Sequence, residues 1–190
     1  MTAFEHVILL LSFVYALALT HLLSGTAELI RAGRRVRFSW FHAAWMLDAL
    51  IVIVANWISF FDLRSAPAWN IGTIVFVLGI AVANYLQAAL VCMDVPEEGP
   101  VDMVAFHERQ GRKYIAATVA SVIMALLANV FLGGAFNVQE WIAQNAAVIP
   151  MMVCTVAALI WIRGRVHALA LIGLGAMWVF YFVALQSALK

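Results

Sequence analysis

The chain consists of long apolar runs separated by short polar segments. Six of these runs reach about 20 residues, the length that an α-helix needs to cross a hydrocarbon core of about 30 Å. They cover residues 4–30, 40–61, 69–93, 113–134, 141–162 and 166–188. Unbroken apolarity over these lengths excludes a transmembrane β-barrel, whose strands alternate apolar and polar residues. The pattern predicts an all-α polytopic integral membrane protein, a single domain of six transmembrane helices over residues 1–190.

Composition narrows the class further. Apolar residues make up 66% of the chain and charged residues 11%, against about 25% charged in an ordinary soluble domain. This balance excludes a soluble globule and a disordered chain. A net charge of +1 gives no basis for a nucleic-acid partner, because phosphate binding needs a concentrated basic face. Cys92 and Cys154 both lie in apolar runs, where a thiol behaves as a small hydrophobe, so no disulfide framework is predicted.

Basic residues are distributed unevenly among the connections. The loops between spans one and two, three and four, and five and six hold Arg31, Arg34, Arg35, Arg37, Arg109, Arg112, Lys113, Arg163 and Arg165. The opposite side has only Arg64 and Lys190. Because Lys and Arg remain in the cytoplasm, we expect both termini on the non-cytoplasmic side of a cell membrane, predicted to be a bacterial inner membrane.

The connection between spans three and four has the most distinctive composition. Residues 94–100 contain two prolines and a glycine, which are typical of an extended turn. Residues 101–112 then carry apolar positions on one face and predict a short cytoplasmic interfacial helix. His107 and Glu108 do not form the HExxH zinc signature, because position 111 is a glycine.

The first three spans each carry one polar stripe. His21, Asp48 and Asn84 all lie ten or eleven residues from the nearest charged cytoplasmic boundary, which is about 15 Å along a helix and therefore close to the membrane midplane. Short connections make these helices neighbours, so we expect the three side chains to converge.

Further polar positions on the same spans extend this predicted site toward the cytoplasm. The residues expected to line that path are Gln87, Glu28 and His42. A histidine beside a carboxylate inside a membrane can carry a proton or hold a cation. The alternative is a structural network, in which polar side chains only bond the helices to one another.

Spans four to six are poor in polar residues and rich in small ones. Small residues recur at packing distance in Ala117, Ser121 and Ala125, and again in Ala170, Gly173 and Ala176. This spacing predicts a helix-packing or oligomer face. Pro150 is expected to bend the fifth span.

Three classes of function are compatible with this sequence. The first is an oligomeric transporter or channel for a proton or small cation, using the mid-membrane site. The second is a non-catalytic accessory or assembly subunit of a larger membrane complex. The third, a membrane enzyme or haem protein, is disfavoured because His21 has no second histidine at matching depth; His42 and His167 lie near the cytoplasmic surface. We therefore expect no cofactor or metal, and as partners the lipid bilayer with a second copy or another membrane protein.

Overall fold

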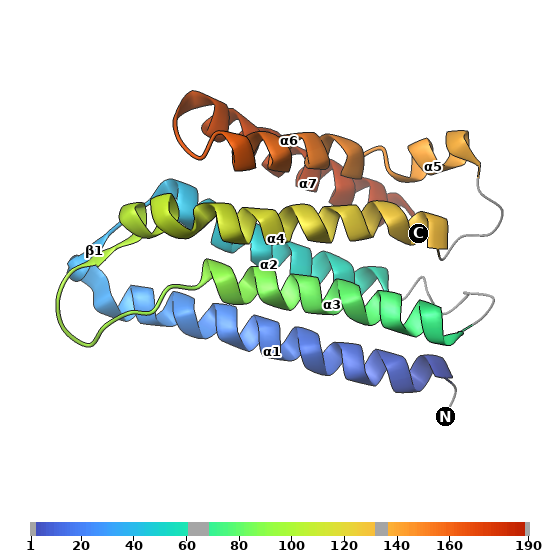
Figure 1. The fold of residues 1–190 in the computed structure, drawn as a ribbon, viewed down its shortest axis with the longest axis horizontal. Helices are drawn as coiled ribbons and strands as arrows, with labels where there is room; N and C mark the ends of the chain where they lie inside the picture. Colours follow the sequence, from blue (N-terminus) through green and yellow to red (C-terminus); the bar gives the residue numbers. More distant parts are fainter. Residues whose placement is uncertain (1–2, 61–68, 132–136, 189–190) are drawn as a thin grey trace. The chain divides into compact units, whose positions relative to one another are not determined.

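The computed structural model describes residues 3–60, 69–131 and 137–188. Arg64, Lys190 and the predicted ends of the second and fourth spans lie outside the described residues. The fold is all-α, as predicted, and is drawn in Figure 1. Its elements are α1 (Ala3–Ala32), the 3-10 turn η1 (Gly33–Arg35), β1 (Val36–Arg37), α2 (Trp40–Ser59), α3 (Ile71–Val91), β2 (Val101–Asp102), α4 (Met103–Phe131), α5 (Val138–Gln144), α6 (Val148–Ile160) and α7 (Gly164–Ala188).

The helices confirm that the chain is a polytopic membrane protein. Within the described residues, α1, α2, α3, α4 and α7 are long and apolar enough to cross a bilayer. A sixth span arises if α5 and α6, which meet at an angle of 67°, are counted together. The break between them covers residues 145–147, one turn before Pro150, because the proline ring excludes a helical carbonyl four residues earlier. The bend predicted for the fifth span is therefore present, slightly ahead of the proline.

The fourth span differs from the prediction at its start. The short interfacial helix expected over residues 101–112 is not a separate element, because residues 103–112 form the first turns of α4. The helix is 29 residues long, about 44 Å at 1.5 Å per residue, and so exceeds the hydrocarbon core. Hydropathy marks where the apolar part of α4 begins, not where the helix begins.

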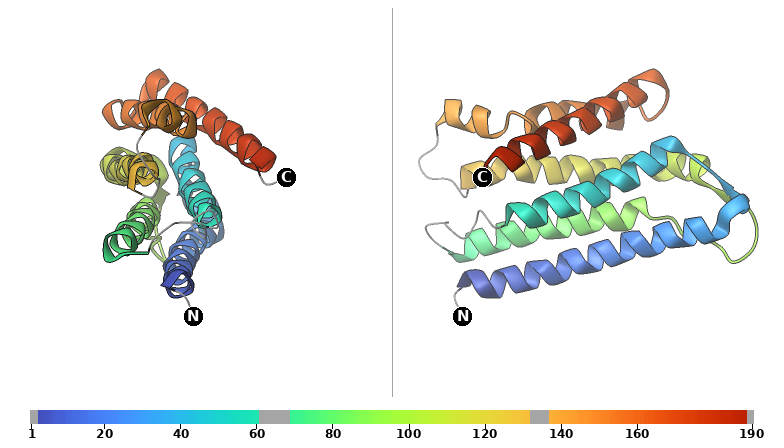
Figure 2. Two further views of the ribbon diagram at one scale, coloured as in Figure 1. Left: turned by 90° about the vertical axis from the view of Figure 1, so that its right-hand side faces the viewer. Right: turned by 180° about the vertical axis from the view of Figure 1, so that it is seen from behind.

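The chain forms two compact units, divided within α4 between Thr118 and Val119. In unit 1, α1 and α3 run in the same direction and α2 runs opposite to both, as the views of Figures 1 and 2 show. The three helices pack on one another. Their contacts include alanines with almost no exposed surface, namely Ala18, Ala49, Ala81 and Ala88, and small side chains allow helix backbones to approach closely.

Two loops of unit 1 are joined at one end of its helices. β1 and β2 form a parallel pair in which Val36 lies opposite Val101. The Arg35 guanidinium donates hydrogen bonds to the carbonyl oxygens of Pro96 and Gly99, at 3.1 and 3.0 Å. Gly99 has a φ of +93°, a conformation that favours glycine. We call residues 35–37 and 96–102 the loop clasp.

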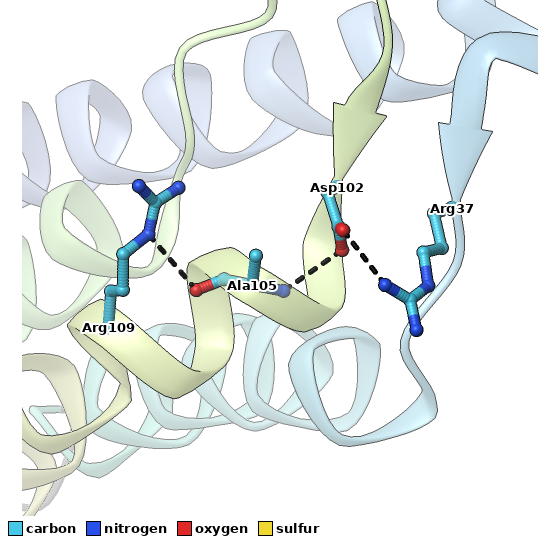
Figure 3. Close-up of polar contacts among 4 residues, drawn as sticks. All are labelled: Arg37, Asp102, Ala105 and Arg109. Carbon is cyan, nitrogen blue, oxygen red and sulfur yellow. Dashed lines mark hydrogen bonds and ion pairs between the residues drawn. The ribbon is translucent and has the colours of Figure 1, made fainter.

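Asp102 links the loop clasp to α4. One carboxylate oxygen accepts the Ala105 backbone N–H at 2.9 Å and caps the helix, and the other lies 3.1 Å from the Arg37 guanidinium (Figure 3). These contacts lower the pKa of Asp102, the Ala105 N–H most and then Arg37. The clasp holds the first and third loops at the same end of unit 1.

In unit 2, α6 and α7 pack against each other. Ala170 is buried, and a Cβ placed on Gly173 would lie only 2.9 Å from the Cys154 sulfur, so this glycine permits the close approach of α6 and α7. Ala176, predicted to belong to the same face, is exposed. Of the three small residues predicted on α7, Gly173 therefore faces α6 and Ala170 is buried.

Candidate functional site

A hydrogen bond between two buried side chains joins α2 to α3 in unit 1. The Gln87 amide nitrogen donates to a carboxylate oxygen of Asp48 at 3.0 Å. Asp48 is 4% exposed and Gln87 is 1% exposed, so the bond is shielded from the surroundings. Asp48 lies eight residues into α2, about 12 Å along its axis. The structure thus brings together two of the predicted site residues, Asp48 near the middle of α2 and Gln87 in the last turns of α3.

A second buried bond joins α3 to α1, one helical turn away. The Asn84 amide nitrogen donates to the Tyr15 hydroxyl at 2.8 Å, and both side chains are buried. Tyr15 was not predicted as a site residue. Its signal is a tyrosine near the middle of a membrane span, because a buried tyrosine hydroxyl needs a hydrogen-bond partner.

His42 occupies the end of this polar region nearest the loop clasp. Its Nε2 lies 2.7 Å from the backbone oxygen of Val91, the last residue of α3, whose carbonyl has no partner within the helix. A carbonyl oxygen only accepts hydrogen bonds, so Nε2 carries a proton, and in the neutral imidazole Nδ1 is then an acceptor. The rings of Phe106 and Tyr114 from α4 lie against the imidazole, with centroids 4.9 and 6.1 Å away.

These contacts form a polar column through unit 1, which we define as His42, Asp48, Gln87, Asn84 and Tyr15. Its length from the Val91 carbonyl to Asn84 is seven residues of α3, about 10 Å. Beyond Asn84, the buried side chains of α3 are apolar: Ala81, Ile80 and Val77. The column therefore begins near the loop clasp and ends inside the helix bundle.

Three buried polar atoms of the column have no hydrogen-bond partner among the described residues. They are His42 Nδ1, Asn84 Oδ1 and Gln87 Oε1. All three are acceptors in the arrangement just described. The column therefore offers three buried acceptors to a donor or a cation.

His21 and Glu28 do not belong to the column, although both were predicted at the site. Both side chains are exposed, and His21 contributes only its backbone oxygen to a weak contact of 3.7 Å with the Cys92 thiol. Each precedes a buried leucine, Leu22 or Leu29, and one residue turns a helix by about 100°. The structure thus buries Asp48, Asn84, Gln87 and His42 in unit 1, whereas His21 and Glu28 lie on exposed positions of α1.

Two further polar residues of α2, Asn56 and Ser59, form hydrogen bonds within their own helix. Asn56 donates to the Val52 carbonyl and Ser59 to the Ala55 carbonyl, both at 2.9 Å. Such bonds to the preceding turn satisfy a polar side chain without a second helix.

His107 of α4 and His167 of α7 each have a hydrogen-bond partner close to them in the chain. His107 shares a hydrogen bond with the Tyr114 hydroxyl, and His167 Nδ1 lies 3.0 Å from the Trp161 backbone oxygen. Across residues 3–60, 69–131 and 137–188, His, Cys, Asp and Glu side chains form no group of three or more able to hold a metal ion.

Fold and site together define a polytopic membrane protein with a buried polar column in one half. No protein-family model matches the chain, and comparisons with curated proteins and with solved structures find no significant match to either.

Proposed function

We propose that the polar column binds a proton or a small monovalent cation within the membrane, as the site of a small transporter or channel. The observation that carries this proposal is the set of three unpaired buried acceptors on the helices that hold the buried Asp48 carboxylate. An unpaired buried polar atom costs about 1–3 kcal/mol. A bound cation, or a proton with its water, offsets that cost because it supplies the donors or positive charge that the column lacks.

The Asp48–Gln87 pair can form a hydrogen bond whether the Asp48 carboxyl group is charged or protonated. A charged Asp48 accepts the Gln87 amide N–H, as in the described bond of 3.0 Å. A protonated Asp48 instead carries an O–H donor, which a 180° rotation of the amide would pair with Gln87 Oε1. The glutamine therefore stabilises both protonation states with one side chain.

Access to the column is expected from one end. His42 lies at the end near the loop clasp, with the α4 rings beside it, whereas apolar side chains close the other end. The predicted topology places the clasp end in the cytoplasm, because the first and third loops carry most of the arginines. An ion would reach Asp48 from that side by way of His42.

Proton flux in proteoliposomes tests this proposal. The full chain is reconstituted with a pH-sensitive dye inside, and a potassium diffusion potential drives protons inward. We expect flux above that of empty vesicles for the native chain and for Glu28→Gln, and no excess flux for Asp48→Asn. Glu28→Gln is the matched control, because it removes an exposed carboxylate of α1 that lies outside the column.

Two results would overturn the proposal. One is normal flux with a folded Asp48→Asn chain, which would leave the column a structural network. The other is the absence of proton, Na⁺ and K⁺ flux with the native chain. His21→Gln is expected to retain native flux, since His21 is exposed and its only contact near the column is made by its backbone oxygen.

A further inference from the structure

An apolar groove of about 500 Å³ lies between α1, α2 and the segment that joins them. Its walls include Leu23 and Ile30 of α1, Phe38 of the connecting segment, and Met46 and Leu47 of α2. The volume falls within the range of about 300–1,000 Å³ that small-molecule sites occupy. All of its lining residues belong to unit 1.

The groove offers no anchor to a polar molecule. Thr26 is the only lining residue with a polar side chain, and its hydroxyl already donates to the Leu22 carbonyl of the preceding turn at 2.8 Å. Leu23, Ile30 and Leu47 are each more than half exposed. In a bilayer these side chains face hydrocarbon, so the groove suits a lipid acyl chain.

Positive charge lies at the end of the groove near the loop clasp. Gly33 lines the groove and is followed directly by Arg34. The clasp engages Arg35 and Arg37, as described above. Arg31 and Arg34 are both exposed, and neither has an ion pair or side-chain hydrogen bond with any described residue.

Aromatic side chains mark the same end as a membrane boundary. Trp40 is 81% exposed and Phe38 is 51% exposed, and their rings meet edge to face with centroids 4.9 Å apart. Exposed tryptophan is typical of the headgroup level of a bilayer. Arg34 therefore lies at the depth of lipid phosphates, where each basic residue adds to the attraction of anionic lipids.

We infer that this groove is a binding site for an anionic phospholipid, with one acyl chain between α1 and α2 and the phosphate on Arg34. Arg31 adds to the positive potential of the same end. This site is separate from the polar column and does not depend on the function proposed for it.

Native mass spectrometry of the full chain in detergent, titrated with short-chain phosphatidylglycerol or phosphatidylcholine, tests the site. We expect the native chain to bind phosphatidylglycerol more tightly. Arg34→Ala should weaken phosphatidylglycerol binding about fivefold and leave phosphatidylcholine unchanged. The control is Arg165→Ala, which removes an exposed arginine at the start of α7 and should change neither.

A second pair of variants tests the acyl-chain position. Ala43→Phe places a ring in the groove, because Ala43 lines it, and should weaken binding of both lipids. Ala16→Phe adds the same ring to an exposed position of α1 outside the groove and should have no effect. Leu47→Gln gives the groove a polar wall without added bulk and covers the case in which Ala43→Phe does not fold.

The lipid site would be disproved by equal affinity for both lipids, or by an Arg34→Ala chain with native preference. Native binding by both Leu47→Gln and a folded Ala43→Phe would equally disprove it.

Discussion

Gln87 connects α3 to the carboxylate of α2 through its amide nitrogen and leaves its own oxygen unpaired. Gln87 can therefore have two roles: its hydrogen bond joins two helices, and its N–H stabilises a buried carboxylate. Replacing Asp48 by asparagine separates these two roles. If the bond is purely structural, removal of Gln87 costs a similar free energy of unfolding in the native chain and in the Asp48→Asn chain. If Gln87 stabilises a charged carboxylate, its removal costs more in the native chain.

We expect Gln87→Leu to destabilise the native chain more than it destabilises the Asp48→Asn chain. The reason is that Leu removes the Gln87 N–H donor from a buried carboxylate, and hydrogen bonds to charged groups contribute about 1.5–3 kcal/mol. The measurement is a double-mutant cycle of unfolding free energies in mixed micelles. Interhelical hydrogen bonds in bilayers average about 0.6 kcal/mol, so a coupling no larger than that would contradict a charged Asp48.

At the scale of the elements, the loop clasp depends on Asp102, which both caps α4 and pairs with Arg37. We expect Asp102→Ala to raise hydrogen exchange of residues 36–37 and 101–102 severalfold at neutral pH. Arg109→Ala is the control: its guanidinium donates to the Ala105 carbonyl at 3.3 Å, on the α4 side of the same turn and away from the clasp (Figure 3).

The pH dependence of the clasp has a defined sign. Because the Ala105 N–H and Arg37 lower the pKa of Asp102, the folded state favours its charged form. The stabilisation is complete above the ordinary pKa of 3.8 and is lost as the pH falls through the lower folded value. Protection of the clasp amides from hydrogen exchange should therefore persist at mildly acidic pH. A loss of protection between pH 7 and 5 would contradict this assignment.

Element positions followed closely from the apolar runs, because a membrane span needs about 20 such residues whatever it packs against. The start of α4 did not follow, since charged residues such as Arg109 and Lys113 end an apolar run without ending a helix. Four of the six predicted site residues lie in the column, because their positions fall on the packed faces of α2 and α3. They are His42, Asp48, Asn84 and Gln87. The prediction for His21 came from its depth along the span, and depth does not say which face of a helix a residue occupies. His21 lies about 100° around α1 from the buried Leu22 and is exposed.

At the scale of the whole molecule, the clasp gives the predicted topology a direct test. In a chain without native cysteines, single cysteines replacing Arg34 and Glu97 should react with an impermeant reagent from the same side of the membrane. Both positions are exposed and lie in the segments that β1 and β2 join. A cysteine replacing Asn70, the cap of α3 at the other end of unit 1, should react from the opposite side.

The predicted orientation also determines from which side of the membrane each position should be labelled. We expect positions 34 and 97 to be protected from the outside reagent in intact cells and labelled after permeabilisation, because short arginine-rich loops are generally retained in the cytoplasm. Labelling of position 34 in intact cells would reverse the orientation. Opposite labelling of positions 34 and 97 would contradict the clasp itself.

The clasp also constrains how the protein is made. Arg37 and Asp102 are 65 residues apart in the chain, and α2 and α3 lie between them. They lie on the same side of the bilayer when both helices have crossed it, whereas a chain in which only one of the two has crossed would have its loops on opposite sides. Insertion of α2 without α3, or of α3 without α2, would therefore prevent the clasp from closing.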